Sequence, residues 1–467
     1  MNIRWHSLIT LLFLLAFVTG CKDEKSDFIN LSFNSFTFDS KGVEELKIEV
    51  SASQGWTVEY EGKWIIEKEK NANALVLQAM PTQSGVERMT RAVFRAGEAV
   101  EYVYLSQLGT NVTYVRLSPN SPATVLSPNG KYIGGVESDL VGNVYVFTPF
   151  IIEVATGKRV EKPKLKESHI ARAITDDGML IVVNESKSKS MYYRGDELID
   201  VRSPGNVREL TITATSSDGN IWVGYAQSTE DRMYRPVKWI NGEPQIMEMP
   251  EKTLLNENVD IGAYARGCSA DGSVIYGALA DDQSALYWKN DKVEYLGKDK
   301  INIHAITVNH SGQDITFAVA DRPVFYADHH CMSPDGRYLA TSFVKTIVQD
   351  ANEKAIFYPA YFDFETETLT YITDLPDGFN DGSGSTINNE GILSFGCPAT
   401  GYTDAFVYDI HTKTTARSID YFKDEYGVTV SKSALILNNT NSGNTIFGLG
   451  IILHAVSYQY WYINVEE

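Results

Sequence analysis

The stretch Met332-Ser333-Pro334-Asp335-Gly336-Arg337-Tyr338-Leu339-Ala340 decides the fold, because variants of it return along the chain. An Asp-Gly pair between two apolar, β-prone runs predicts a tight reversal, since glycine adopts positive φ and aspartate hydrogen-bonds its own backbone. A short strand follows most copies, as at Ile275-Tyr276-Gly277. The other copies are Ser127-Pro128-Asn129-Gly130, Thr175-Asp176-Asp177-Gly178, Ser216-Ser217-Asp218-Gly219, Ser269-Ala270-Asp271-Gly272, Asn309-His310-Ser311-Gly312, Asn388-Asn389-Glu390-Gly391 and Asn441-Ser442-Gly443.

Most of these turn glycines recur at intervals of about 40 to 55 residues, which is typical of a β-propeller with four short strands per blade. The interval between Gly312 and Gly336 is too short for four strands. Either this blade has three strands and the propeller has eight blades, or the copy at Ser311-Gly312 is not a blade turn and there are seven. We favour eight. The segment Tyr114 to Leu117 is expected to close the ring by pairing with Trp461 to Val465.

The fold class predicted is therefore all-β, with a small β-sandwich at 31-110 and a β-propeller at 112-467. In the first of these regions, Leu46, Ile48 and Val50 alternate with charged residues, which indicates a half-buried strand. Aromatic residues reach 11% of the chain, which also favours sheet over helix.

The N-terminal region carries the marks of a bacterial lipoprotein. Residues 1-20 combine Arg4 with an apolar run too short to span a bilayer, which indicates a signal peptide. The run ends in Val18-Thr19-Gly20-Cys21, which resembles a lipobox and implies lipidation of Cys21. The alternative is an ordinary cleaved signal with a chance cysteine. Residues 21-30 are read as a tether, and their Lys22-Asp23-Glu24-Lys25 resembles the signal that exports lipoproteins to the outer face of the outer membrane.

Four landmarks within 31-110 resemble the BACON domain, a bacteroidete-associated, carbohydrate-binding module. They are Gly55-Trp56-Thr57-Val58, Trp64-Ile65, Arg91-Ala92-Val93-Phe94 and Leu105-Ser106-Gln107-Leu108-Gly109. The resemblance implies an immunoglobulin-like sandwich. It also raises Trp56 and Trp64 as sugar-stacking residues. The alternative, which we favour, is that both rings fill the core and that the domain is a spacer.

Two further resemblances concern the repeats. The segment Gly267 to Gly277 with Trp288 downstream is similar to the extracellular repeats of the HAF family. The segments Leu126 to Gly134 and Met332 to Ala340 are similar to the repeats of TolB-like propellers. These resemblances imply fold alone, because propellers host enzymes, binders and scaffolds.

The candidate ligand-binding residues are cationic groups close to the turns. Six residues before the turn glycine stand Arg172, Arg266, His330 and Ser385, and His304 lies eight before another. Such positions are expected at the mouth of the central channel, where they would attract a carboxylated or sulfated sugar. The alternative is that each arginine pairs with an acidic residue of the next blade.

Several function classes are excluded or left without support. A net charge of −19 argues against nucleic acid as a partner. No nucleophile elbow, zinc motif, phosphate loop or calcium loop appears, so no catalytic residue, metal or cofactor is predicted. Cys268, Cys331 and Cys397 are expected to be buried and unpaired. The sequence predicts a surface-anchored, non-catalytic lipoprotein that binds a glycan or a protein of a glycan-uptake system. The alternatives are a propeller glycoside hydrolase or polysaccharide lyase, and a structural scaffold.

Overall fold

A computed structural model describes residues 27–60, 62–82, 88–108, 112–116, 123–141, 144–325, 331–399, 402–426, 428, 430, 435–439, 445–451 and 458–465. Its contacts divide the chain into two compact units. The first holds the described residues up to Pro81 together with Met89–Gln107, and the second consists mainly of the chain from Leu108 onward. No helix among the described residues has the length and apolar character needed to cross a bilayer.

The first unit is a sandwich of two four-stranded sheets. One sheet has the order β1 (Ile29–Leu31), β3 (Glu45–Ala52), β6 (Ala74–Ala79) and β5 (Ile65–Asn71). The other has the order β2 (Ser35–Phe38), β8 (Ala99–Gln107), β7 (Arg88–Ala96) and β4 (Thr57–Tyr60). The alternation expected in β3 is confirmed, because Leu46, Ile48 and Val50 are buried between exposed charged residues.

Both tryptophans of the sandwich lie in its core. Trp56 and Trp64 are each 9% exposed and belong to one cluster with residues of both sheets. The Trp56 ring packs on Phe94 at 5.6 Å, and its Nε1 donates a hydrogen bond to the carbonyl of Ala72. The edge of Phe38 meets Trp64 at 6.3 Å. The placement is that of framework residues, and neither ring presents an open face for a sugar to stack on.

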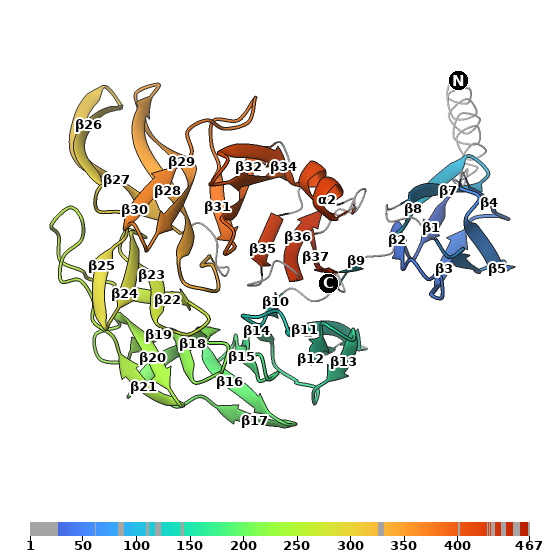
Figure 1. The fold of residues 1–467 in the computed structure, drawn as a ribbon, viewed down its shortest axis with the longest axis horizontal. Coiled ribbons are helices and arrows are strands. Elements are labelled where there is room, and N and C mark those ends of the chain that lie inside the picture. Colours follow the sequence, from blue (N-terminus) through green and yellow to red (C-terminus); the bar gives the residue numbers. More distant parts are fainter. Residues whose placement is uncertain are drawn as a thin grey trace, which may run out of the picture. The chain divides into compact units, whose positions relative to one another are not determined.

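The second unit is a β-propeller whose sheets stand around a common centre (Figure 1). The first sheet has the order β10 (Ala123–Leu126), β11 (Tyr132–Val141), β12 (Val144–Glu153) and β13 (Lys158–Glu161). The second sheet consists of β14 (His169–Ile174), β15 (Leu180–Asn184), β16 (Lys189–Arg194) and β17 (Glu197–Asp200). The third consists of β18 (Val207–Thr215), β19 (Ile221–Ser228), β20 (Tyr234–Ile240) and β21 (Glu243–Ile246). A single parallel bridge between Lys189 and Leu210 joins these two.

The remaining sheets complete the ring. The fourth sheet consists of β22 (Ala263–Cys268), β23 (Val274–Leu279), β24 (Ala285–Lys289) and β25 (Lys292–Tyr295). The fifth consists of β26 (Asn302–His310), β27 (Gln313–Val324), β28 (Tyr338–Gln349), β29 (Asn352–Asp363) and β30 (Thr368–Tyr371). The sixth consists of β31 (Ser383–Ile387), β32 (Ile392–Ala399), β33 (Tyr402–Asp409) and β34 (Thr414–Arg417). Helix α2 (Ser418–Tyr426) leads into the last sheet, of β35 (Leu435–Asn439), β36 (Thr445–Ile451), β37 (Tyr458–Val465) and β9 (Val112–Arg116).

The ring closes by pairing its first strand with its last. In this antiparallel pair Tyr114 stands opposite Ile463, and Arg116 stands opposite Trp461. The pairing predicted from Tyr114 onward is therefore confirmed as far as Arg116, and Leu117 lies outside the described residues.

The short interval before Gly336 has a structural explanation. His310 pairs directly with Gln313, so Ser311-Gly312 is the exposed two-residue tip of the hairpin β26–β27. This hairpin does not form a sheet of its own, because the last residues of β27 pair with β28. The arrangement favours the alternative of seven blades over the eight that we expected.

Six other copies of the repeated turn share one hydrogen-bond pattern. The residue three before each glycine is at most 3% exposed, and its side-chain oxygen accepts the N–H of the following strand at 2.7–3.1 Å. The six residues are Ser127, Thr175, Ser216, Ser269, Ser333 and Asn388. The turn glycines have φ between 71° and 83°, which disfavours any residue with a Cβ.

Successive turns are also hydrogen-bonded to one another, and we call these links the turn chain. Asn129 N–H donates to Asp176 Oδ1, and Asp176 N–H donates to the carbonyl of Ser217. Ser217 N–H donates to Ala270 O at 2.7 Å, and Ala270 N–H donates to Pro334 O at 3.0 Å. Asp335 N–H donates to Asn389 Oδ1. Neighbouring sheets are thus joined at these turns by hydrogen bonds of backbone groups that would otherwise have to bond to water.

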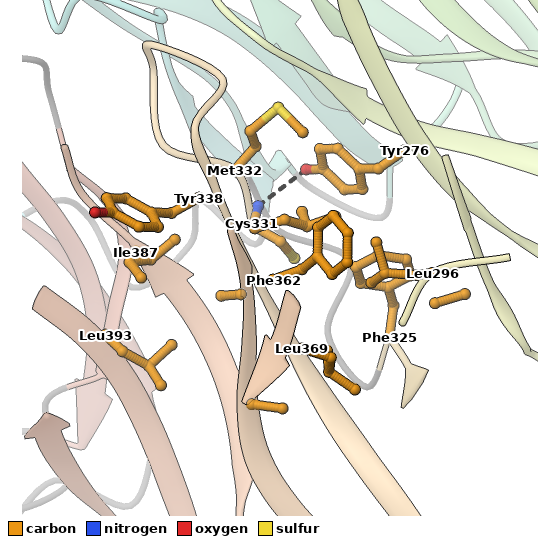
Figure 2. Close-up of a cluster of buried hydrophobic side chains, with 14 of the residues drawn as sticks. Tyr276, Leu296, Phe325, Cys331, Met332, Tyr338, Phe362, Leu369, Ile387 and Leu393 are labelled. Atoms are coloured by element: carbon orange, nitrogen blue, oxygen red, sulfur yellow. Dashed lines mark hydrogen bonds between the residues drawn. The ribbon is translucent and has the colours of Figure 1, made fainter. Parts of the chain in front are cut away.

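Between the sheets lies continuous apolar packing. Figure 2 shows one cluster, in which Leu296 comes from the sheet of β22–β25, Phe362 from β29 and Leu393 from β32. Across the cluster Tyr276 accepts a hydrogen bond from Cys331 N–H at 2.9 Å. Burying aromatic and aliphatic surface from both neighbours stabilises each sheet at about 25 cal/mol per Å².

The three cysteines after Cys21 are free thiols. Cys331 and Cys397 are buried, as expected, whereas Cys268 is half-buried. Burial raises the pKa of the Cys397 thiol to about 12. This thiol is therefore protonated at neutral pH and unreactive as a nucleophile.

We expect the substitution Ser333→Ala to destabilise the propeller. It removes the acceptor of the buried Tyr338 N–H and the donor to Asp335, so the free energy of unfolding should fall by about 1–3 kcal/mol. Urea unfolding followed by tryptophan fluorescence measures the loss. The control is Thr307→Ala, which removes a hydroxyl hydrogen bond on the exposed hairpin β26–β27 and should cost far less. Equal losses would contradict the role given to the turn.

Candidate functional site

The innermost strands of five sheets share a β-bulge at the same distance from the turn. In β14 the pairing register with β15 shifts between Ala171 and Ala173, so the residue between them is the bulge. The innermost strands of four other sheets show the same shift. The bulge residues are Arg172, Thr213, Arg266, Ser385 and Leu437, and each stands six residues before a turn glycine of the repeat. A bulge re-aims the side chain of its extra residue, so these positions form one structural class.

Where the bulge residue carries a hydroxyl, it joins two sheets. Thr213 Oγ1 donates to the carbonyl of Ala265 at 3.0 Å, and Ser385 Oγ donates to the carbonyl of Ile436 at 3.0 Å. Each acceptor stands directly before the bulge residue of the next sheet. A small hydroxyl side chain at the bulge is therefore sufficient to hydrogen-bond one sheet to the next.

At two of the other three bulge positions an arginine stands in place of the hydroxyl residue, and the third is Leu437. Arg172 makes no hydrogen bond or ion pair with the residues that the structure describes, and its half-buried side chain leaves Nε without a partner there. Arg266 donates from Nη2 to Gln283 Oε1 at 2.9 Å. Arg172 forms no salt bridge to an acid of the next sheet within the described part of the chain, so the pairing alternative receives no support at this position.

Three tyrosines from neighbouring strands pack against one another, and we call them the tyrosine cluster. Tyr225 lies on β19, Tyr234 on β20 and Tyr264 on β22, and their ring centroids are 4.8–5.7 Å apart. All three rings are half-buried. The hydroxyl of Tyr234 points to Glu209 Oε2 on β18 at 3.4 Å.

Each ring of the cluster has its own arginine within electrostatic reach. Burial, and to a smaller extent the charge of Glu209, raises the pKa of all three tyrosines, that of Tyr264 to about 12. Smaller effects in the opposite direction come from Arg172 on Tyr225, Arg208 on Tyr234 and Arg266 on Tyr264. The phenols are therefore protonated hydrogen-bond donors at neutral pH, with three guanidinium groups around them and one carboxylate.

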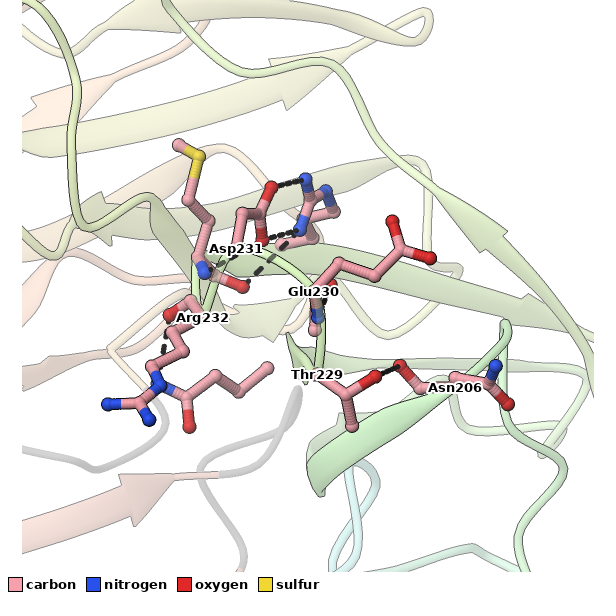
Figure 3. A network of polar contacts seen from close by, with 9 residues as sticks. Asn206, Thr229, Glu230, Asp231 and Arg232 are labelled. Atoms are coloured by element: carbon pink, nitrogen blue, oxygen red, sulfur yellow. Dashed lines mark hydrogen bonds and ion pairs between the residues drawn. The ribbon is translucent and has the colours of Figure 1, made fainter.

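The loop between β19 and β20, which carry Tyr225 and Tyr234, is held by its own polar contacts (Figure 3). Thr229 Oγ1 donates to the carbonyl of Asn206 at 3.2 Å, and Arg235 donates two hydrogen bonds to the Asp231 carboxylate. These bonds hold the pKa of Asp231 below its usual range. The loop thus links the beginning of β18 to β20 without depending on a ligand.

The other predicted site residues are placed differently. His304 lies on β26, where it carries no bulge and faces Val319 of β27, so it does not belong to the class of Arg172 and Arg266. His330 and the lipidation residue Cys21 lie outside the described residues.

The sequence analysis did not find Arg208, Glu209 or the tyrosine cluster. The one feature of the sequence that could have pointed to the cluster is Tyr264, because it stands two residues before Arg266 on the same strand. Tyr225 and Tyr234 follow no period that would have placed them beside it. Within the described chain, no group of three or more His, Cys, Asp or Glu is placed to hold a metal ion.

No protein-family model and no curated protein matches the chain. The chain is, however, similar to several solved structures. The β-propeller domain of the Trilobed protease from Pyrococcus furiosus is 12% identical, with 73% of this chain and 94% of that chain covered and a TM-score of 0.43. An oligogalacturonate lyase in complex with manganese is 12% identical over 83% and 99%, with a TM-score of 0.43. TolB from Acinetobacter baumannii is 12% identical over 65% and 62%, with a TM-score of 0.33. These likenesses concern the fold alone.

Tyr264 gives the cluster a measurable pH dependence. Its folded-state pKa of about 12 exceeds that of an unfolded tyrosine, about 10, so the folded chain keeps a proton that the unfolded chain loses. The free energy of unfolding should therefore fall as pH rises from about 10 toward 12. In Tyr264→Phe this fall should be shallower, as measured by urea unfolding across that range. An unchanged slope in the variant would contradict the burial of this phenol.

Proposed function

We propose that the chain is a non-catalytic binding protein whose propeller recognises an acidic glycan at the tyrosine cluster. The observation that carries the proposal is a cluster of three half-buried tyrosines, each within electrostatic reach of an arginine, in a chain with a net charge of −19. Guanidinium groups form strong, directional hydrogen bonds with carboxylate and sulfate, and protonated phenols donate to hydroxyl and ring oxygens. The fixed β19–β20 loop limits the ordering that binding would require.

The use of arginine at a bulge supports a binding role for Arg172 and Arg266. Threonine and serine at the same position of other sheets hold the ring together, so the fold does not require a guanidinium there. In Arg172 the buried Nε has no partner among the described residues, which costs stability, and such costs are typical of functional positions.

The double variant Arg172→Thr/Arg266→Thr tests this role. Threonine is the residue that the neighbouring sheet has at this position, so the melting temperature should not fall. Affinity for a carboxylated or sulfated polysaccharide should fall by at least about 100-fold, because two charge-assisted hydrogen bonds are lost. Affinity gel electrophoresis on a polysaccharide panel, followed by calorimetry, measures the change.

The matched control is Arg202→Thr, which removes one positive charge from an exposed ion pair with Glu243. This variant should bind like the wild type. Binding of the wild type should weaken as salt is added, since the attraction is electrostatic. Undiminished binding by the double variant would overturn the proposal, and so would equal weakening by the control.

The enzyme alternatives are tested in the same incubations. A glycoside hydrolase would release new reducing ends, and a lyase would release unsaturated products. The raised pKa of all three tyrosines is unfavourable for a phenolate base at neutral pH, so we expect retardation without products. Products at a rate abolished by substitution in the cluster would replace the binding proposal with an enzyme.

The proposal includes the cellular location. The lipobox-like Val18-Thr19-Gly20-Cys21 and the following acidic residues support a lipid anchor at Cys21 in the outer membrane, facing outward, with the BACON-like sandwich as spacer. Mass spectrometry of the membrane-extracted protein should find fatty acids on Cys21. Cys21→Ala should move the protein out of the membrane fraction. An unmodified Cys21 in the extracted chain would refute the anchor.

A further inference from the structure

The structure contains a second candidate site, a cavity whose lining includes none of the three tyrosines. A cavity of about 380 Å³ opens where β16, β17 and β18 meet. Its volume is near the lower end of the range for ligand sites, which fits a small ligand rather than a polymer. The residues used below are Lys189, Asp200, Val201, Asn206, Val207 and Leu210, all of which line it.

The floor of the cavity is aliphatic. Val201 and Leu210 are 6% and 3% exposed, and Val207 is half-buried. The position of the floor is fixed from two sides, because Ser190 Oγ accepts the N–H of Ile212 at 2.7 Å and Leu210 N–H donates to Ser188 O. This part of the site therefore exists before any ligand arrives.

Three polar groups stand at the mouth with unused hydrogen-bonding capacity. Lys189 and Asp200 are exposed, and neither side chain makes a hydrogen bond or ion pair with the described residues. Asp200 stands opposite Met191, two residues from Lys189, so both side chains lie on the same face of the β16–β17 pair. The backbone carbonyl of Asn206 accepts from Thr229, which leaves its side-chain amide available (Figure 3).

We infer that this cavity binds one uncharged sugar unit. The opposite charges of Lys189 and Asp200 balance, so the mouth does not select a charged ligand as the arginines at the tyrosine cluster do. A hydroxyl both donates and accepts, so neighbouring hydroxyls can donate to Asp200, accept from Lys189 and do either with Asn206. The C–H face of the ring covers Val201, Val207 and Leu210, which adds hydrophobic burial.

The test is titration of the full chain with glucose, galactose, mannose and N-acetylglucosamine, by saturation-transfer NMR and calorimetry. At least one sugar should bind in the millimolar range or tighter. Asp200→Ala and Asn206→Ala should each weaken it by at least about tenfold. The control Glu197→Ala, on the same strand but outside the cavity, should not. Glycine and leucine serve as zwitterionic probes of the same two charges.

Each outcome decides the inference. No sugar binding by the wild type overturns it, as does binding that Asp200→Ala leaves intact, or binding of the zwitterions in place of sugars. The inference is independent of the acidic-glycan proposal, because Arg172→Thr/Arg266→Thr should leave neutral-sugar binding unchanged. Loss of neutral-sugar binding in that double variant would place the sugar at the tyrosine cluster and refute the cavity.

Discussion

The propeller depends on a buried side-chain oxygen at the start of each repeated turn. In this position Ser333 and its five equivalents accept the first N–H of the next strand, where water cannot reach. The same turn then presents its backbone to the neighbouring turn, as Ser217 does to Ala270. One local interaction therefore sets the shape of each reversal and the link between sheets, and the apolar layers such as that around Phe362 fill the space so defined.

The bulge positions show that one place in the repeat can carry side chains of different kinds. Thr213 and Ser385 use the position to join neighbouring sheets, whereas Arg172 and Arg266 occupy it with groups that the frame does not need. The links of the turn chain remain in place only a few residues from both arginines, at the turns that follow their strands. The bulge and the turn are thus separate positions, and the hydrogen bonds that join the turns do not involve the guanidinium groups.

The repeated turns, the sandwich strand β3 and the pairing of β9 with β37 were predictable, because each follows from local chemistry or from a period. The copy at Ser311-Gly312 misled the blade count, since its letters match the other turns and only its exposure differs. The spacing of Arg172 and Arg266 identified a shared position but not its bulge. The tyrosine cluster was not predictable, because Tyr225, Tyr234 and Tyr264 come from strands of two sheets.

The pairing of β9 with β37 has a consequence for biosynthesis. The ribosome makes β9 before every sheet of the propeller and β37 after all of them, so roughly the whole length of the second unit separates the two partners. The final sheet offers unpaired edges until β37 has been made, and bringing such distant segments together is slow. A stop codon before Tyr458 would leave β9 and β36 without their partner and expose the chains to aggregation and proteolysis.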